Sequence, residues 1–403
     1  MSEGQAALPD FADAGVAGTY PPSGERELRV APGFGKTFNV YRIPLIPLAC
    51  WRMDELWFDF DSSFPRPEAA TELPLLYALR MQHGAAPMSV FGHADPVGDD
   101  PYNKTLSGRR ADAVYGLLTR DTARWEKLYG HPAGGDQWGL RTTQVMLRAA
   151  GYDPGPADGV MGPRTRGATE SFQKAKGLTA DGDPGPKTRA ALYANYMDLL
   201  CVTDEGGPFR FQPADFLAKG ADPGGKGDVQ GCSEFNPLLV FSQQERTELS
   251  QPAERDRRNA ENAPNRRVVV FLFRPGSEVA PGAWPCPRVS EGIGDCKKRF
   301  WSDGETRRTP QATRRKFEDT EDTFACRFYH RLATSSPCEK YALRDYVRVE
   351  DELADPVANT EVNCVMSDGS VMTMKTDPKG MILVYGKRLA RIEIEDIHKL
   401  SEG

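Results

Sequence analysis

The sequence MSVFGHADPVGDDPYNKTLSGRRADAV, residues 88–114, determines the expected fold more than any other stretch of the chain. Residues 88–93 alternate as a half-buried strand does, and a loop rich in Gly, Asp and Pro follows. We predict that Thr105 or Ser107 caps a helix after this loop. The apolar residues of that helix recur with helical spacing and form its buried face: Ala111, Val114, Tyr115 and Leu118.

Asp95 and Arg110 form the candidate site of this stretch. Asp95 lies at the strand end and Arg110 in the predicted first turn of the helix, so we expect both to line one pocket. A carboxylate binds an ammonium group, and a guanidinium binds a carboxylate through two parallel hydrogen bonds. The pair therefore suits a zwitterionic ligand. The alternative is a surface salt bridge, which contributes little to stability.

The same residues resemble the signature of the OmpA-like peptidoglycan-binding domain. The resemblance rests on Gly92-His93-Ala94-Asp95, Asn103, Leu106-Ser107 and Arg110-Ala111. In that family an Asp and an Arg hold the diaminopimelate of the peptide stem. By position these roles fall on Asp95 and Arg110, with Asn103 as a supporting polar contact. Ala94 stands where the family usually has Thr, which removes one hydroxyl group from the site.

A second segment contains an internal repeat, DGVMGPRT at residues 158–165 and DGDPGPKT at residues 181–188. In each copy Asp-Gly makes a tight turn and Pro opens a helix. The helix between the copies has a core stripe of Ala168, Phe172 and Ala175, and Gly177 ends it. The segment resembles the three-helix peptidoglycan-binding domain attached to many bacterial cell-wall hydrolases. The turns also serve simply to fold such a domain, so they are not assigned as ligand contacts.

Residues 265–268, Asn-Arg-Arg-Val, lead into a β-rich run at 269–273 and resemble the closing strand of the OmpA-like domain. A charged, helix-like stretch at 242–262 precedes them. We therefore interpret the three-helix domain as an insertion, since loop-closure entropy grows only slowly with loop length. The alternative is a truncated first domain followed by a separate domain that begins near Phe209.

The predicted fold class is α+β: an OmpA-like βαβα-β sandwich interrupted by a small three-helix domain, then a cysteine-containing segment and a small C-terminal β-sandwich. The domains are a disordered segment at 1–28, a discontinuous OmpA-like domain at 29–128 and 205–275, the inserted domain at 138–200, a cysteine- and aromatic-rich segment at 276–340 and a β-sandwich tail at 341–403.

Further elements follow from local patterns. Strands are expected at 38–48 and 56–60, and a helix at 69–83 with Leu73, Leu76 and Met81 facing inward. The tail shows four short strands separated by hairpin turns, at 361–366, 370–375, 381–385 and 390–395. It resembles transthyretin-like β-sandwich modules of cell-surface proteins and contractile-injection spikes.

The chain has eight cysteines, four of them in the cysteine-rich segment: Cys286, Cys296, Cys326 and Cys338. Their spacing lacks the paired C-x-x-C of a structural zinc site, so no metal site is predicted. A disulfide-linked subdomain is favoured if the protein matures in an oxidising compartment. Four buried thiols are the alternative. Nothing in the sequence orients His330 toward Cys326 as a catalytic pair.

Composition excludes several functions. The balance of 51 basic and 57 acidic residues gives net charge −6 and no basic footprint for nucleic acid. No apolar run approaches the roughly 20 residues of a membrane span, so no membrane insertion is expected. The first 30 residues show no signal peptide. We expect synthesis in the cytoplasm and action in the periplasm or cell envelope, or after secretion.

These patterns predict a non-enzymatic protein that recognises the diaminopimelate-containing stem peptide of peptidoglycan. The tail and the missing signal peptide suggest association with a contractile, type VI-like secretion apparatus, as cargo or spike accessory. No catalytic residue and no cofactor are predicted, because the five histidines lack an H-E-x-x-H spacing and no catalytic carboxylate pair stands out. The alternative is a peptidoglycan hydrolase, a cell-wall lytic effector, with an unrecognised catalytic segment in 274–340.

Overall fold

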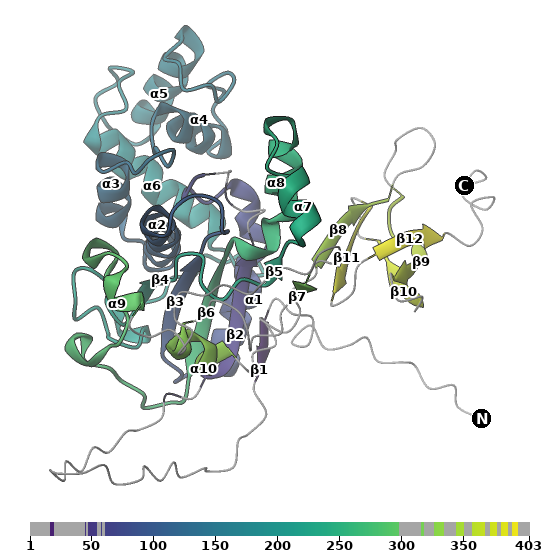
Figure 1. The fold of residues 1–403 in the computed structure, drawn as a ribbon. Coiled ribbons are helices and arrows are strands. Elements are labelled where there is room, and N and C mark those ends of the chain that lie inside the picture. Colours follow the sequence, from purple (N-terminus) through teal and green to yellow (C-terminus); the bar gives the residue numbers. More distant parts are fainter. Residues whose placement is uncertain are drawn as a thin grey trace, which may run out of the picture.

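The computed structural model describes most of residues 45–297 and shorter segments on either side. The described residues are 17–19, 45, 47–54, 58, 61–297, 316–317, 326–333, 344–349, 357–366, 371–376, 380–385 and 389–393. They form a mixed α+β structure, as predicted (Figure 1).

A five-stranded sheet organises the larger part of the molecule. Its spatial order is β1 (Ala17–Thr19), β2 (Pro47–Asp54), β6 (Arg267–Phe273), β3 (Met88–His93) and β4 (Val229–Gly231). Strand β6 comes late in the sequence but pairs antiparallel with both β2 and β3, and β3 pairs parallel with β4. The strand expected to close the sheet therefore lies beside β3, and the whole three-helix segment lies between these two strands in sequence.

Both faces of β6 are buried. Val268, Val270 and Leu272 belong to one hydrophobic cluster, and Val269, Phe271 and Phe273 belong to another. Successive side chains of a strand point to opposite faces, so this alternation places one cluster on each side of the sheet. The sheet consequently needs a covering layer on both faces.

Helices cover the first face. The helix α2 (Asp100–Thr119) and the helix α1 (Leu73–Gln82) contribute apolar residues to the same cluster as Val268, Val270 and Leu272. After α2 come α3 (Thr122–Gly130), α4 (Leu140–Ala149), α5 (Pro163–Ala175) and α6 (Pro186–Leu200). Helix α6 contacts α3 and α4, and a group of aromatic rings joins these helices to the 61–65 loop: Phe64, Trp125, Trp138, Tyr193 and Tyr196.

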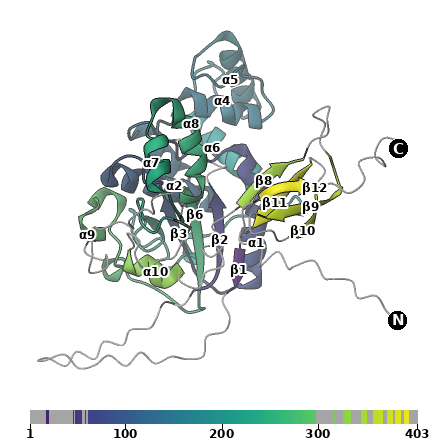
Figure 2. The same cartoon turned by 45° about the vertical axis from the view of Figure 1, so that its right-hand side comes forward.

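The cysteine-containing segment covers the second face. Trp284, Cys286, Tyr329 and Leu332 pack in the cluster that contains Phe271. They come from the segment around α9 (Gly294–Lys297) and from α10 (Arg327–Ala333), and Figure 2 shows both helices beside the sheet. This segment is therefore part of the core of the sheet.

The remaining elements lie at the edges or in the tail. They are η3 (Pro67–Thr71), η4 (Pro213–Asp215), β5 (Leu239–Val240), α7 (Gln243–Glu248), η5 (Pro252–Glu254), α8 (Arg255–Glu261), η6 (Ala263–Asn265), η7 (Pro281–Ala283), η8 (Val289–Glu291), β7 (Lys316–Phe317), β8 (Arg344–Arg348), β9 (Glu361–Met366), β10 (Val371–Lys375), β11 (Met381–Tyr385) and β12 (Leu389–Glu393). In the tail β10, β9 and β12 form one sheet, and β11 and β8 form a second. All four strands predicted there are present, and β8 was not predicted.

Some sequence-based expectations about the N-terminal elements differ from the structure, and others fall largely outside the described residues. Strand β1 lies inside the segment 1–28 that was expected to be disordered. Strand β2 lies between the two predicted strands and overlaps only the end of 38–48, whose residues 38–44 lie outside the described part of the chain. Of the expected strand at 56–60, only Phe58 is described, and it forms a bridge to Pro65. Met81 is 51% exposed, although it was expected to face inward.

The start of helix α2 also differs from the expectation. Its N-cap is Asp99, whose side chain accepts a hydrogen bond of 2.7 Å from the backbone N–H of Tyr102. Pro101 sits in the first turn, where a missing N–H costs nothing. Thr105 and Ser107 therefore do not cap the helix, and Arg110 lies in its middle. The predicted buried face of Ala111, Val114, Tyr115 and Leu118 is confirmed.

Two further elements differ in detail. Strand β3 is buried along its entire length, because α2 covers one face and the cysteine-containing segment the other, so it is not the half-buried strand that alternation suggested. The charged stretch 242–262 is interrupted at Pro252, where η5 separates α7 from α8.

We expect Phe271→Ala to lower the free energy of unfolding by about 3–5 kcal/mol, because the change leaves a cavity in the second core. The Phe271 ring contacts Phe91, Phe273 and Tyr329. Equilibrium unfolding in urea measures the loss. Met81→Ala is the control, since this exposed side chain should change stability by less than about 0.5 kcal/mol. Equal losses for the two variants would contradict the burial of β6 on its second face.

Candidate functional site

Asp95 follows β3 and is buried. One carboxylate oxygen, Oδ1, accepts a hydrogen bond of 2.8 Å from the backbone N–H of Val97. The other, Oδ2, forms an ion pair with the guanidinium of Arg266, which is also buried. Arg266 immediately precedes β6, so this ion pair joins the end of β3 to the beginning of its neighbouring strand. Sequence analysis named Arg266 only as part of a strand motif.

Asn103 extends the same group of side chains. Its amide Nδ2 donates to the backbone carbonyl of Asp95 at 3.1 Å and to Oε2 of Glu234 at 2.6 Å. Asp95, Asn103, Glu234 and Arg266 are all buried, and we call them the Asp95 cluster. It contains two carboxylates and one guanidinium within a low-dielectric environment, where charges interact strongly. Glu234 was missed by sequence analysis because nothing local connects it with Asp95.

Arg110 lies about two turns after Asn103 on α2 and is fully buried. Its Nε donates a hydrogen bond of 2.9 Å to the carbonyl of Ser62, and its guanidinium lies 5.4 Å from the centre of the Phe58 ring. The structure thus brings Asp95 and Asn103 together, and it places Arg110 against Phe58 and Ser62. A single pocket shared by Asp95 and Arg110 stays a prediction.

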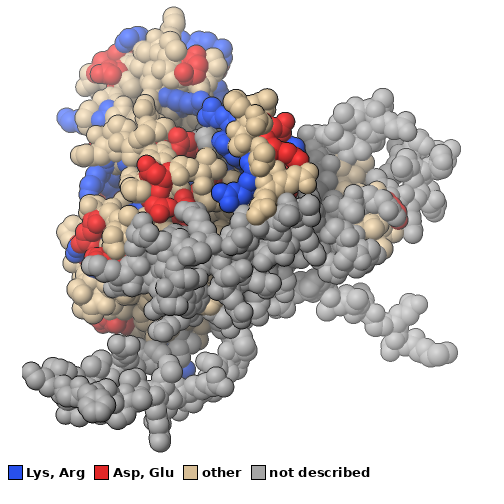
Figure 3. All heavy atoms as spheres, viewed as in Figure 1, with Lys and Arg blue, Asp and Glu red and all other residues tan. Residues whose placement is uncertain are grey.

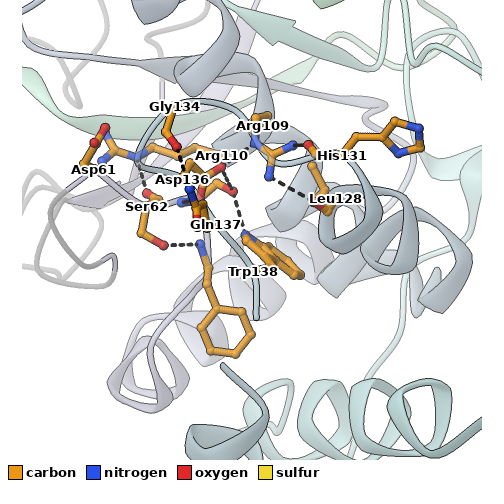
Figure 4. Close-up of polar contacts among 12 residues, drawn as sticks. Asp61, Ser62, Arg109, Arg110, Leu128, His131, Gly134, Asp136, Gln137 and Trp138 are labelled. Carbon is orange, nitrogen blue, oxygen red and sulfur yellow. Dashed lines mark hydrogen bonds and ion pairs between the residues drawn. The ribbon is translucent and has the colours of Figure 1, made fainter. Parts of the chain in front are cut away.

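A buried acid–base contact fixes the segment beside Arg110 (Figure 4). Asp136 accepts hydrogen bonds from the backbone N–H of Ser63 at 2.7 Å and from the Ser63 hydroxyl at 2.6 Å, and it pairs with Arg109. Arg109 also donates to the carbonyls of Leu128 and His131, at 3.1 Å and 2.6 Å. We call Ser63, Arg109 and Asp136 the Asp136 clamp. The connection between α3 and α4 is therefore anchored to the loop at Ser63 through Asp136.

His93, at the end of β3, has a packing role. Its Nδ1 lies 3.2 Å from the carbonyl of Phe235, and its ring packs edge-on against Tyr329. Burial, together with the positive charge of Arg267, holds the pKa of His93 well below its usual value. The imidazole is therefore neutral near pH 7, and Nδ1 carries the proton that it donates to the carbonyl.

The two Asp-Gly repeats form equivalent turns in the three-helix segment. Gln144 Nε2 donates to Asp158 and Thr165, and Gln173 Nε2 donates to Asp181 and Thr188, at distances of 2.7–3.1 Å. The Gly of each turn donates its backbone N–H to the same glutamine and has positive φ, +79° and +72°. Each turn is therefore held by one buried glutamine. These contacts serve folding, and they leave the ligand-contacting residues of this segment unassigned.

The cysteines differ from the predicted disulfide-linked subdomain. Cys286, Cys296 and Cys326 are buried thiols, and Cys338 lies outside the described residues. Cys50 in β2 is disulfide-bonded. The contact between Cys326 and His330 is a backbone hydrogen bond of 2.9 Å at the start of α10. That geometry gives no support to a catalytic pair.

The described residues contain no group of three or more His, Cys, Asp or Glu side chains arranged to hold a metal ion. Within the same residues no helix is long and apolar enough to cross a membrane. Figure 3 shows Lys and Arg mixed with Asp and Glu over the helices on one face of the molecule.

One segment of the chain is similar to a known family of domains. Residues 139–192 match the model of a family described as "Putative peptidoglycan binding domain". The match covers the three-helix segment and supports binding to peptidoglycan. The OmpA-like and transthyretin-like resemblances stay predictions.

Relatives share short segments with the chain. Outer membrane porin F of Pseudomonas fluorescens is 41% identical over 64 residues, 16% of this chain and 20% of that protein. The zinc D-Ala-D-Ala carboxypeptidase of Streptomyces albus G is 43% identical over 60 residues, 14% and 23% of the two chains. The N-acetylmuramoyl-L-alanine amidase CwlM of Mycobacterium tuberculosis is 40% identical over 65 residues, 16% of each. The chain thus spans less than a quarter of these relatives. No solved structure matches it.

We expect Asp136→Ala to lower the free energy of unfolding by about 3–5 kcal/mol, because Arg109 would keep a buried charge without its carboxylate. Asp153→Ala is the matched control, since Asp153 pairs with Arg164 on the surface and both side chains are mostly exposed. This control should change stability little. Urea unfolding measures both variants. A small effect of Asp136→Ala would contradict the role of the clamp.

Proposed function

We propose that the protein is a non-enzymatic peptidoglycan-binding protein that recognises the diaminopimelate-containing stem peptide. The observation that carries the proposal is the family match of residues 139–192. The similarity to outer membrane porin F and the OmpA-like signature around Asp95 support it further. Each of the two modules would bind the same polymer.

The Asp95 cluster provides the chemistry for one end of the ligand. The stem peptide offers an ammonium group, which would compete with Arg266 for the Asp95 carboxylate. Arg266, once displaced, could bind a carboxylate of the same ligand through two parallel hydrogen bonds. Asn103 would keep the Asp95 backbone in place through its 3.1 Å hydrogen bond. The Asp95–Arg266 ion pair thus already holds a negative and a positive group side by side, as a zwitterionic ligand requires.

Access to this cluster runs through the loop after β3. Asp95 and Asn103 are buried, whereas Pro96, Gly98 and Asp99 are exposed. Gly98 has φ of +102°, a conformation that side chains rarely adopt, and it lies next to the Asn103 amide. In our proposal a shift of residues 96–99 admits the ligand. Arg110, about two turns after Asn103 on α2, would bind a second group of the stem beside Phe58 and Ser62.

Two modules on one chain would increase retention on the wall. Linking two weak binders raises the effective concentration of the second site, which can strengthen overall binding by about 10²-fold when both sites reach the polymer. Helix α6 contacts α3, which directly follows α2. The three-helix segment would therefore present its surface in a fixed orientation relative to α2.

We further propose that the protein acts in the periplasm or cell envelope, or after secretion, with the tail as a connection to a contractile, type VI-like apparatus. This part of the proposal is supported by the resemblance of the tail strands alone. Co-purification with a spike component would test it.

A second candidate is a cell-wall hydrolase. It is favoured by two relatives whose names denote an amidase and a carboxypeptidase. Its catalytic groups would lie in residues 274–340, of which 298–315, 318–325 and 334–340 fall outside the described residues.

We expect Asp95→Asn and Arg110→Lys each to weaken binding to isolated sacculi by about 10- to 100-fold, the loss of one charged hydrogen-bonded contact. Co-sedimentation across a range of sacculus concentrations measures the change. Binding should also be weaker to sacculi whose stem carries lysine in place of diaminopimelate. Circular dichroism of each variant verifies that it is folded.

Asp215→Asn and Arg80→Lys are the matched controls. These two residues form an ion pair of 2.9 Å at the edge of α1, away from Asp95, and should leave binding unchanged. If folded Asp95 and Arg110 variants bind like the controls, the stem-peptide site is wrong even when the three-helix segment retains the protein on sacculi. Release of soluble muropeptides by the unaltered protein would instead establish the hydrolase.

A further inference from the structure

Helix α8, which lies beside α7 in Figures 1 and 2, contacts the Asp95 cluster through Arg266. The guanidinium of Arg266 pairs with Asp95 through Nη1, and its Nη2 donates a hydrogen bond to the backbone carbonyl of Asn259 on α8. Asn259 and the preceding Arg258 are partly buried, whereas residues 255–257 and Ala260 of the same helix are exposed. We call Arg258 and Asn259 the α8 pair.

Each residue of the α8 pair contains one buried polar atom that makes no hydrogen bond to any described residue. These atoms are the guanidinium Nε of Arg258, which is a donor, and the amide Oδ1 of Asn259, which is an acceptor. Buried polar atoms of native proteins are nearly always hydrogen-bonded. Burying such an atom without a partner costs free energy, and a ligand that supplies the partner recovers it. The α8 pair therefore offers one donor and one acceptor to a bound molecule.

A peptide bond has the matching chemistry, because it presents one N–H and one C=O group. Asn259 Oδ1 can accept a hydrogen bond from the N–H, and Arg258 Nε can donate one to the C=O. Neither contact needs a charge on the ligand. The charged groups of a zwitterion have their own partners nearby, since Asp95 and Arg266 already form an ion pair.

We propose that the α8 pair binds a peptide bond of the stem next to the diaminopimelate residue. The proposal rests on the proposed function, which places the ammonium and carboxylate groups of diaminopimelate at Asp95 and Arg266. Because Arg266 contacts both Asp95 and the Asn259 backbone, its displacement by the ligand would separate α8 from the end of β3 and expose the α8 pair. The site would then distinguish diaminopimelate within a peptide from the free amino acid.

Isothermal titration calorimetry of the full chain with two ligands tests the proposal. The ligands are free diaminopimelate and the tripeptide L-Ala–γ-D-Glu–diaminopimelate. The unaltered protein should bind the tripeptide about 10- to 100-fold more tightly, as expected for one or two additional hydrogen bonds. Asp95→Asn should weaken the binding of both ligands, which assigns the measured binding to this site and not to the three-helix segment.

Asn259→Leu removes Oδ1 and keeps a side chain of similar size. We expect it to weaken binding of the tripeptide about 10-fold and to leave binding of free diaminopimelate unchanged. Its Tm without ligand should not fall, because the Arg266 contact uses the backbone carbonyl that the variant retains. Asn259→Ala should show the same selective loss if leucine does not fit. Arg258→Lys, which keeps the positive charge and lacks Nε, should show it as well.

Gln243→Leu, at an exposed position of α7, is the matched control and should bind both ligands like the unaltered protein. Equal affinity of the unaltered protein for the two ligands would overturn the proposal. Unchanged binding of the tripeptide by Asn259→Leu, or an equal loss for both ligands with a lower Tm, would overturn it too. If the unaltered protein binds neither ligand, or Asp95→Asn binds both normally, the stem-peptide site of the proposed function is wrong as well.

Discussion

The burial of β6 on both faces is the constraint on which the rest of the structure depends. A strand with the sequence RVVVFLF presents apolar side chains in both directions, and each face must be shielded from water. Helices α1 and α2 shield Val268, Val270 and Leu272, and the cysteine-containing segment shields Val269, Phe271 and Phe273. Neither layer can be removed without exposing half of the strand, so the segment after β6 is as necessary to this sheet as the helices before it.

Side chains of helix α2 make polar contacts with several segments that surround that sheet. Four of its residues reach different parts of the chain: Asn103 the Asp95 cluster, Lys104 the backbone beside two cysteines, Arg109 the Asp136 clamp and Arg110 the loop at Ser62. Asn103 and Arg110 lie about two turns apart on one face of the helix, whereas Lys104 and Arg109 point in other directions. This spacing explains how one helix can serve four contacts. The proposed ligand site and the structural anchors therefore share one support.

The sequence predicted what short-range patterns determine. The strand Met88–His93, the buried stripe of α2, the two Asp-Gly turns and the tail strands all follow from periodicity and turn chemistry. The N-cap at Asp99 could also be predicted, because Asp-Asp-Pro is typical of a helix start. The expected caps, Thr105 and Ser107, lie further along the helix. Contacts between residues distant in sequence could not be predicted. Glu234 contacts Asn103 across a sequence separation of 131 residues, and Arg266 contacts Asp95 across 171 residues. Such contacts are decided by the topology of the sheet.

The late position of β6 in the chain also has a consequence for folding. Strands β2 and β3 are made early, yet the strand that separates them is made only after the three-helix segment and β4. Until β6 arrives, the inner edges of β2 and β3 have no partner, and such edges can pair with those of another chain. Contacts between residues far apart in sequence form slowly. The growing chain therefore passes through a stage in which its helices can fold while its sheet stays open, and protection against aggregation is needed most during that interval.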